Sequence, residues 1–210
     1  MEQNTLKVKA KFMLKDNVLV YIMRHGRTEW NIQGRLQGRL NSSLLPESIE
    51  VLRSIGKRLQ GCGISAIYSS PLERCRQSAC MISDILKVPV LYLDDLMECD
   101  HGKCEGLSLE EVENAFPGFI TGREAGDKWN IRWPGGESYS DVAARAERAI
   151  CNMDMTRSAL IVAHETVNKV LSGLFLDLDH TEIMRKKQKN SEVFRINQLD
   201  KTLEIIDCQL

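Results

Sequence analysis

The sequence lacks a long apolar run and lacks an excess of charge of either sign. A membrane-spanning helix needs about 18 consecutive apolar residues, and no stretch approaches that length. The first 17 residues, MEQNTLKVKAKFMLKDN, contain no apolar core of the kind that a secretory signal needs. The net charge is −1, whereas a general nucleic-acid surface needs a basic excess. We therefore expect neither a membrane nor a nucleic acid as a partner.

The sequence also lacks a C-x-x-C pair, although it contains seven cysteines. An odd number of cysteines without a regular spacing argues against a disulfide framework and favours the reducing cytoplasm. The stretch CDHGKC, from Cys99 to Cys104, has metal-binding residue types, but no second ligand pair stands at the spacing of a zinc finger. We expect no metal and no other cofactor.

No internal repeat, low-complexity segment or linker divides the chain. Its 210 residues, 43% of them hydrophobic, suit one domain with a sizeable core. We therefore expect a single domain over residues 1–210. Residues 1–16 are interpreted as a flexible tail or as an edge strand that starts late. The basic run RKKQK, at 185–189, is interpreted as a solvated helix end or loop.

Strand-like and helix-like patterns alternate along the chain. Continuous apolar runs predict strands at 18–23, 64–68, 90–93 and 159–163, with a closing hairpin at 193–196 and 203–206. Apolar spacing and cap residues predict helices at 45–61, 71–86, 138–152 and 165–175, and a short one after the capping box at 108–111. This alternation predicts an α/β fold, a three-layer sandwich with a mostly parallel sheet and helices on both faces.

Polar side chains follow three of the predicted strands. The first strand ends in Arg24-His25-Gly26, the second leads through two serines to Arg74, and the run at 159–163 ends in His164. In open α/β sheets, ligands bind beyond the carboxyl ends of the strands. These groups form one pocket if the three strands are neighbours.

The residue types at these strand ends suit a phosphoryl group. A neutral imidazole is a nucleophile near pH 7, and guanidinium groups match phosphoryl oxygens with paired hydrogen bonds. A glycine beside them lets the backbone approach an anion closely. Each residue also has a structural interpretation: a strand-end histidine is often a hydrogen-bonding group, and Arg74 could pair with Glu73 or Glu111. Groups of the same kind at three strand ends favour the phosphate site.

The segment MRHGRTEWN, from Met23 to Asn31, resembles the signature of the histidine phosphatase superfamily, also called phosphoglycerate mutase-like. Other segments resemble its further motifs in the same order: LQG at 36–38, YSSPLERCRQSA at 68–79, LME at 96–98 with the glycines at 102 and 106, PGGES at 134–138 and ALIVAH at 159–164. The resemblance spans about residues 18–175. It rests on six ordered segments, so it is specific.

The resemblance implies a role for each matching residue. The implied catalytic set is His25, Glu98, Arg24, Arg74 and His164. In this set His25 takes the phosphoryl group as a phosphohistidine, while Glu98 protonates the leaving oxygen and then activates water. The implied phosphate-binding set is Arg24, Asn31, Arg74, His164 and Thr28. Glu105 is the rival proton donor, but its place beside a glycine suits a structural role better. No metal is implied, because arginines supply the positive charge.

Some positions depart from the superfamily pattern or have two interpretations. Glu165 stands where the superfamily usually has glycine, and we expect its carboxylate to point away from the phosphate, at a helix N-terminus. The segment NSSLLPES, at 41–48, departs from the usual entry to the first helix, which concerns the pocket rim more than the phosphate clamp. His101 is interpreted as an exposed loop histidine rather than a substrate contact. Four residues either shape the pocket or pack in the core: Trp30, Leu36, Trp129 and Trp133.

The preferred function is a metal-independent phosphatase for a small phosphorylated metabolite. One alternative is a phosphoglycerate mutase, which returns the phosphoryl group to the substrate. The compact segment 94–136, interpreted as an insertion that covers the substrate, is more similar to that of the small phosphatases such as α-ribazole phosphatase. The other alternative is a non-catalytic module that binds a phosphorylated ligand. The substrate and the oligomeric state stay open, a homodimer being one option.

Overall fold

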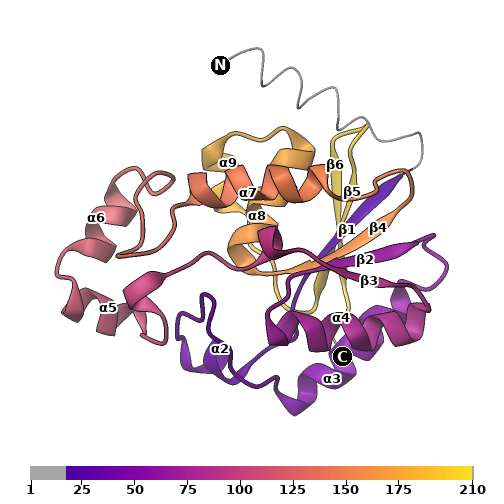
Figure 1. Ribbon diagram of the computed structural model, residues 1–210, viewed down its shortest axis with the longest axis horizontal. Coiled ribbons are helices and arrows are strands. Elements are labelled where there is room, and N and C mark those ends of the chain that lie inside the picture. The colour runs from indigo at the N-terminus through magenta and orange to yellow at the C-terminus, as the bar shows by residue number, and fades with distance from the viewer. Residues whose placement is uncertain (1–17, 210) are drawn as a thin grey trace.

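Six strands form one sheet in the order β3-β2-β4-β1-β5-β6 in the computed structural model, which describes residues 18–209 (Figure 1). The strands are β1 (Leu19–Arg24), β2 (Ala66–Ser69), β3 (Val90–Tyr92), β4 (Ala159–Ala163), β5 (Glu192–Asn197) and β6 (Thr202–Asp207). The first four are parallel, and β5 and β6 form the predicted antiparallel hairpin. The mostly parallel sheet is confirmed. The prediction for residues 1–16 lies outside the described residues.

Helices cover both faces of this sheet (Figure 1). The helices α3 (Pro46–Arg58) and α4 (Glu73–Leu86) lie on one face, and α7 (Tyr139–Cys151) and α8 (Glu165–Leu176) lie on the other. The other helices are α2 (Glu29–Gln33), α5 (Leu109–Ala115), α6 (Phe119–Ala125) and α9 (His180–Arg185), with short 3₁₀ turns η1 (Asp94–Leu96) and η2 (Gly102–Cys104). The three-layer architecture is confirmed. None of the helices in the described part of the chain is long and apolar enough to cross a membrane.

Strand β4, and β1 as far as Met23, are continuously apolar because both faces of the sheet are covered there. Along β1, Val20 and Ile22 pack into the core beneath α7 and α8, whereas Tyr21 and Met23 pack into the core beneath α3 and α4. All five residues of β4 are buried. A strand with one solvated face would instead alternate apolar and polar residues. The two cores therefore explain the runs from which these strands were predicted.

Three short helices, α2, α6 and α9, were not predicted. Two of them begin at capping boxes: Thr28 with Asn31 for α2, and Asp179 with Glu182 for α9. The predicted capping boxes of α5 and α7, at Ser108 and Ser138, are present. The basic run at 185–189 lies at the end of α9 and in the following loop, as predicted, but Gln188 within it is buried rather than solvated.

The order of the strands brings the predicted site together. Strand β4 lies between β1 and β2 and is parallel to both. In the register, Arg24 of β1 pairs with Ala163, and Ser69 of β2 pairs with Val162. The sequence analysis predicted one pocket only if the three strands are neighbours, and they are. The residues that follow them therefore lie at the same edge of the sheet.

Candidate active site

A cavity of about 370 Å³ lies beyond the carboxyl ends of these strands. Five of the predicted residues line it: Arg24, His25, Asn31, Arg74 and Glu98. The segment 94–136 lines it as well, through Glu98, His101, Leu109, Ile120, Arg123, Glu124, Lys128 and Trp133. His164 is completely buried beside the cavity, with its ring centroid 5.3 Å from that of His25. The cavity thus joins the strand ends to the segment that was interpreted as their cover.

The backbone around His25 fixes the direction of its ring. The Nδ1 of His25 lies 2.8 Å from the carbonyl oxygen of Gly26. A carbonyl can only accept, so Nδ1 carries the proton and the lone pair of Nε2 is free. The loop itself is held by Ser78, whose Oγ accepts from the Gly26 N–H at 2.9 Å, and by Asn190, whose Nδ2 donates to the carbonyl of His25 at 2.7 Å. This leaves Nε2 as the ring atom available to a ligand, which is the orientation that the predicted nucleophilic role requires.

His25 and His164 are both neutral near pH 7. Burial, reinforced by the charges of Arg74 and Arg24, lowers the pKa of His25 well below its usual value. Burial and the charge of Arg74 do the same to the pKa of His164. The Nε2 of His164 lies 2.8 Å from the Oγ of Ser70 and 3.4 Å from the Sγ of Cys75. A neutral imidazole at position 25 is the form that a nucleophilic role requires.

The lowered pKa values of His25 and His164 lead to a prediction of how the free energy of unfolding depends on pH. Their pKa values are lowered in the folded chain, so the unfolded chain takes up more protons as the pH falls below about 6.5. The contribution of the neutral rings to the unfolding free energy is complete above that pH and falls by about 1.4 kcal/mol per pH unit for each ring below it. Urea unfolding at about pH 7.5 and about pH 5.5 measures the loss. The His164→Asn variant should lose less between the two conditions, and an equal loss would contradict this origin.

Arg74 is held by the loop at 38–41. Its Nη1 donates to the carbonyl of Leu40 at 2.6 Å and to the Oδ1 of Asn41 at 3.0 Å, and its Nη2 donates to the carbonyl of Gly38 at 2.7 Å. The alternative pairing with Glu73 or Glu111 is not among these contacts. Asn41 belongs to the segment 41–48 that departs from the superfamily pattern, so this departure reaches the phosphate clamp as well as the rim.

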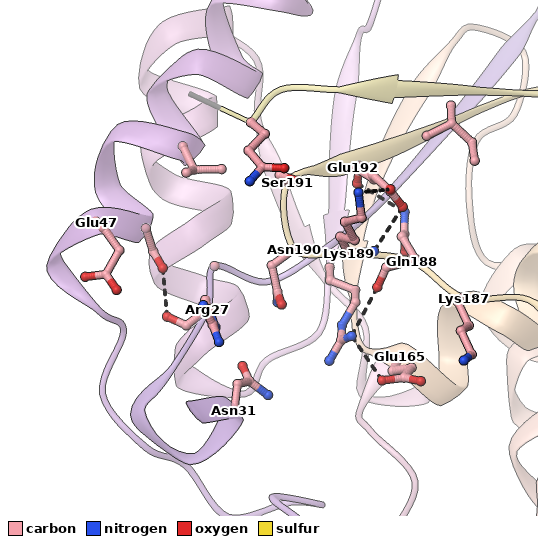
Figure 2. A pocket seen from close by; sticks show the side chains of 16 residues that line it. Arg27, Asn31, Glu47, Glu165, Lys187, Gln188, Lys189, Asn190, Ser191 and Glu192 are labelled. Carbon is pink, nitrogen blue, oxygen red and sulfur yellow. Dashed lines mark hydrogen bonds and ion pairs between the residues drawn. The ribbon is translucent and has the colours of Figure 1, made fainter. Parts of the chain in front are cut away.

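Arg24 is paired with Glu165, so the expectation that Glu165 points away is wrong. The Nη1 of Arg24 lies 3.0 Å from the Oε2 of Glu165 and donates to the carbonyl of Gln188 at 3.1 Å. In Figure 2 these are the dashed lines that end on Glu165 and Gln188. Lys169, one turn along α8, lies 2.9 Å from the other carboxylate oxygen. Two cations therefore hold the Glu165 carboxylate at the cavity, which it lines.

The two candidate proton donors differ in position. Glu98 lines the cavity; its carboxylate accepts from the N–H of Cys99 at 2.8 Å and from the N–H of Thr166, at the start of α8, at 3.4 Å. Glu105 does not line the cavity and accepts from the backbone N–H of Arg39 at 2.7 Å. Of the two, Glu98 lines the cavity and Glu105 makes a structural contact, and the role of Glu98 as proton donor stays a prediction.

Thr28 and Asn31 lie at the start of α2. The Thr28 hydroxyl accepts from the N–H of Asn31 at 3.4 Å and from the Nε2 of Gln37 at 2.7 Å. The Oδ1 of Asn31 accepts from the N–H of Thr28 at 3.0 Å. Asn31 lines the cavity, whereas Thr28 is buried behind it and caps the helix. The phosphate contact of Thr28 stays a prediction.

His101 is buried, so its interpretation as an exposed loop histidine is wrong. Only 9% of its surface is exposed, because its ring packs edge-on against Trp133 at a centroid distance of 4.7 Å. Leu36 and Trp133 line the cavity. Trp129 instead packs in the core and stacks on His180 at 3.8 Å. Of the three tryptophans left open, Trp133 lines the cavity, whereas Trp30 and Trp129 do not.

Arg123 is a cavity residue that was not singled out in the sequence. It comes from α6, is 4% exposed, and lies over the rings of Trp133 at 4.7 Å and Tyr139 at 5.5 Å. Its Nε and Nη2 have no hydrogen-bond partner within residues 18–209. Arg123 lies outside the motifs, so the sequence around it does not mark it as a cavity residue. The feature of the sequence that could have indicated it is the presence of aromatic residues, Trp133 and Tyr139, on which it stacks.

Metal-binding residue types are not clustered in the described chain. Within residues 18–209, no group of three or more histidine, cysteine, aspartate or glutamate side chains is placed to hold a metal ion. Cys99 and Cys104 are buried and free. The positive charge around His25 comes from Arg24 and Arg74.

The comparison with protein families agrees with this geometry. The family model for the histidine phosphatase superfamily (branch 1) matches residues 20–208. The chain belongs to this superfamily. It is 32% identical over 166 residues to human 6-phosphofructo-2-kinase/fructose-2,6-bisphosphatase 1, an alignment that covers 78% of this chain and 34% of that protein. The chain therefore spans about a third of the length of the curated relatives it matches.

Solved structures of histidine phosphatase type share the fold. Bacillus stearothermophilus YhfR is 25% identical, with a TM-score of 0.74 over 90% of this chain and 96% of that one. The α-ribazole phosphatase from Shigella flexneri is 22% identical, with a TM-score of 0.73 over 90% and 95%. A mycobacterial glucosyl-3-phosphoglycerate phosphatase is 22% identical, with a TM-score of 0.74 over 85% and 89%. The structural neighbours of this histidine phosphatase superfamily member thus include phosphatases.

Proposed function

We propose that this chain is a phosphatase that hydrolyses a small phosphomonoester whose leaving group carries a second anionic group. One observation carries the proposal. Arg24, Arg74 and Arg123 line the same cavity, and each has a buried Nε without an acceptor in the described part of the chain. A buried donor without a partner costs about 1–3 kcal/mol. An anionic ligand would provide the missing acceptors.

The first chemical step transfers the phosphoryl group to His25. The lone pair of its Nε2 attacks phosphorus while the bond between phosphorus and the leaving oxygen breaks. Arg24 and Arg74 stabilise the charge on the non-bridging oxygens, beside an imidazole that is itself buried. Glu98, in its acid form, gives a proton to the leaving oxygen. The products of this step are an alcohol and a phosphohistidine.

The second step returns the phosphoryl group to water. Glu98, now a carboxylate, accepts a proton from a water molecule as the water oxygen attacks phosphorus. The bond between phosphorus and Nε2 breaks, so inorganic phosphate leaves and His25 regains its lone pair. Glu98 is then protonated again, and no metal takes part in either step.

Arg123 is the group that suits a second anion. Its donors belong to the segment 94–136, whereas the donors of the phosphoryl site belong to the strand ends. A relative whose chain is 32% identical is named for fructose 2,6-bisphosphate, a phosphomonoester with two phosphoryl groups. Fructose 2,6-bisphosphate is therefore the first substrate to test.

The test measures inorganic phosphate released by the wild-type protein in the presence of a chelator. Fructose 2,6-bisphosphate, 3-phosphoglycerate and p-nitrophenyl phosphate are compared at equal concentration. The substrates with a second anion should have a kcat/KM at least about 10-fold above that of p-nitrophenyl phosphate, because one charge-assisted contact contributes about 1.5–3 kcal/mol. Rapid acid-free quenching with a ³²P-labelled substrate should trap the label on the protein.

Three results would contradict the proposal. Hydrolysis that needs an added metal would indicate another mechanism. Efficient interconversion of phosphoglycerate isomers with a bisphosphate primer would favour the mutase. Binding of phosphorylated compounds without any release of phosphate would favour the non-catalytic module.

A further inference from the structure

The phosphate clamp contains a carboxylate of its own. Glu165 directly follows His164, lies in the first turn of α8 and lines the cavity. Its Oε2 lies 3.0 Å from the Nη1 of Arg24, and its Oε1 lies 2.9 Å from the Nζ of Lys169. A phosphoryl group bound at His25 would thus share Arg24 with a second anion that belongs to the protein.

The direction of the Arg24 guanidinium does not depend on Glu165 alone. The same Nη1 donates to the carbonyl of Gln188 at 3.1 Å. Gln188 is itself fixed, because its Nε2 donates to the carbonyl of Ile22 at 2.7 Å and its Oε1 accepts from Asn168 at 2.8 Å. A neutral side chain at position 165 would therefore leave Arg24 held by the backbone. What Glu165 adds is negative charge.

The Glu165 carboxylate is ionised at neutral pH. Burial raises its pKa, but the charges of Arg24 and Lys169 outweigh burial and hold the pKa below its usual value. The Glu165 side chain is 42% exposed and lines a second, open cavity of about 960 Å³ that shares Arg24 and Asn31 with the first. Figure 2 shows this second cavity, with Lys187 on the same side as Glu165.

We propose that the negative charge of Glu165 competes with the phosphate group for Arg24, so that inorganic phosphate binds weakly and leaves quickly. The inference rests on the proposed function, in which phosphate is the product. Two anions that share one guanidinium in a partly buried site repel each other, because water screens them only partly. Release of product limits the turnover of many enzymes, so weak phosphate binding favours turnover.

The test measures the binding of inorganic phosphate by isothermal titration calorimetry. Glu165→Gln keeps a hydrogen-bond acceptor and removes the charge, so phosphate should bind about 5-fold to 10-fold more tightly. Glu165→Asp keeps the charge and should bind phosphate within about 2-fold of the wild type. The matched control is Glu124→Gln. Glu124 also lines the cavity, but its partner is Lys128 rather than an arginine beside His25, so phosphate binding should change by less than about 2-fold.

Kinetics add a readout that a purely structural role would not move. With p-nitrophenyl phosphate, Glu165→Gln should lower KM, and it should leave kcat unchanged or lower it because phosphate leaves more slowly. The inference is overturned if Glu165→Gln binds phosphate no more tightly than the wild type, or if Glu124→Gln or Glu165→Asp tightens binding equally. If circular dichroism shows that Glu165→Gln is unfolded, Glu165→Ala is measured in its place.

A negative result in the calorimetric test can be distinguished from a negative result in the test of the proposed function. Phosphate binding needs no turnover, so a chain that binds phosphate but hydrolyses nothing disproves the phosphatase and leaves the competition at Arg24 measurable. A chain that hydrolyses phosphomonoesters through His25 but shows no tightening in Glu165→Gln disproves only the role of Glu165.

Discussion

Replacement of His25 with alanine is expected to lower kcat/KM for p-nitrophenyl phosphate by about 10⁴-fold or more. The change removes the imidazole that lines the cavity beside Arg24 and Arg74 and that is proposed to attack phosphorus. The loop should keep its shape, because Ser78 and Asn190 bind its backbone rather than the imidazole. Steady-state release of p-nitrophenol, together with the ³²P-labelled phosphoenzyme, measures the loss.

The matched control for this prediction is His180→Ala. His180 is exposed at the start of α9, where it stacks on Trp129, and it does not line the cavity. This variant should keep kcat/KM within about 2-fold of the wild type. If His25→Ala instead retained about a tenth or more of the wild-type activity, direct attack by water would replace the covalent mechanism. Thermal unfolding of both variants separates a catalytic loss from a loss of folded protein.

The strands that carry the site could be predicted from the sequence because their burial leaves a strong pattern. From Val20 to Met23 in β1, and throughout β4, the side chains pack into one of two covered cores, so both segments are continuous apolar runs. The polar residues after them stand out against these runs. The position of β4 between β1 and β2 brings the strand ends together. This order of strands could not be predicted from the sequence, which showed only that a shared pocket requires the three strands to be neighbours.

The contacts of Glu165 show which part of the site the sequence could not predict. Its pair with Lys169 lies four residues away on the same helix, and this spacing is a recognised signal for an ion pair. Its pair with Arg24 joins residues that lie on β1 and α8, far apart in the sequence. Only the adjacency of β1 and β4 brings them together. The charge that a phosphate meets at the clamp therefore depends on topology as well as on motifs.

The segment 94–136 was predicted less well for a related reason. His101 follows a loop and has no periodic neighbours, so nothing local indicated that Trp133 would cover it. Helix α6 is short and lacks a side-chain cap, which leaves Arg123 without a helical pattern around it. The short helices α2 and α9 did carry capping boxes, but each is too short for apolar periodicity. Burial by distant parts of the chain decided these positions.

Arg123 is built like a binding group rather than a structural one. Its guanidinium lies over Trp133 and Tyr139, which fixes its plane through cation–π contacts. Burial lowers its pKa, yet an arginine stays charged at neutral pH. A buried charge with two unused donors is costly unless an anion pairs with it. The geometry therefore favours a ligand whose second anionic group reaches α6.

The Arg123→Met variant should lose activity in a way that depends on the substrate. For fructose 2,6-bisphosphate, kcat/KM is expected to fall by about 10²-fold, because one or two charge-assisted hydrogen bonds are lost. For p-nitrophenyl phosphate, which has no second anion, it should change by less than about 3-fold. Arg123→Lys should be intermediate, since a lysine keeps the charge but not the planar fork. The ratio of the two kcat/KM values is the quantity to measure.

Arg35→Met separates a specific contact from the general loss of a cation. Arg35 also lines the cavity, but its Nη1 already donates to the carbonyl of Gly106 at 2.6 Å and to Glu111 at 2.8 Å. With its donors occupied, Arg35 should change the ratio of the two kcat/KM values by less than about 3-fold. If Arg123→Met lowers both values equally, then Arg123 holds the segment 94–136 in place. A ratio that changes only in Arg123→Met would identify α6 as the end of the cavity that recognises the leaving group.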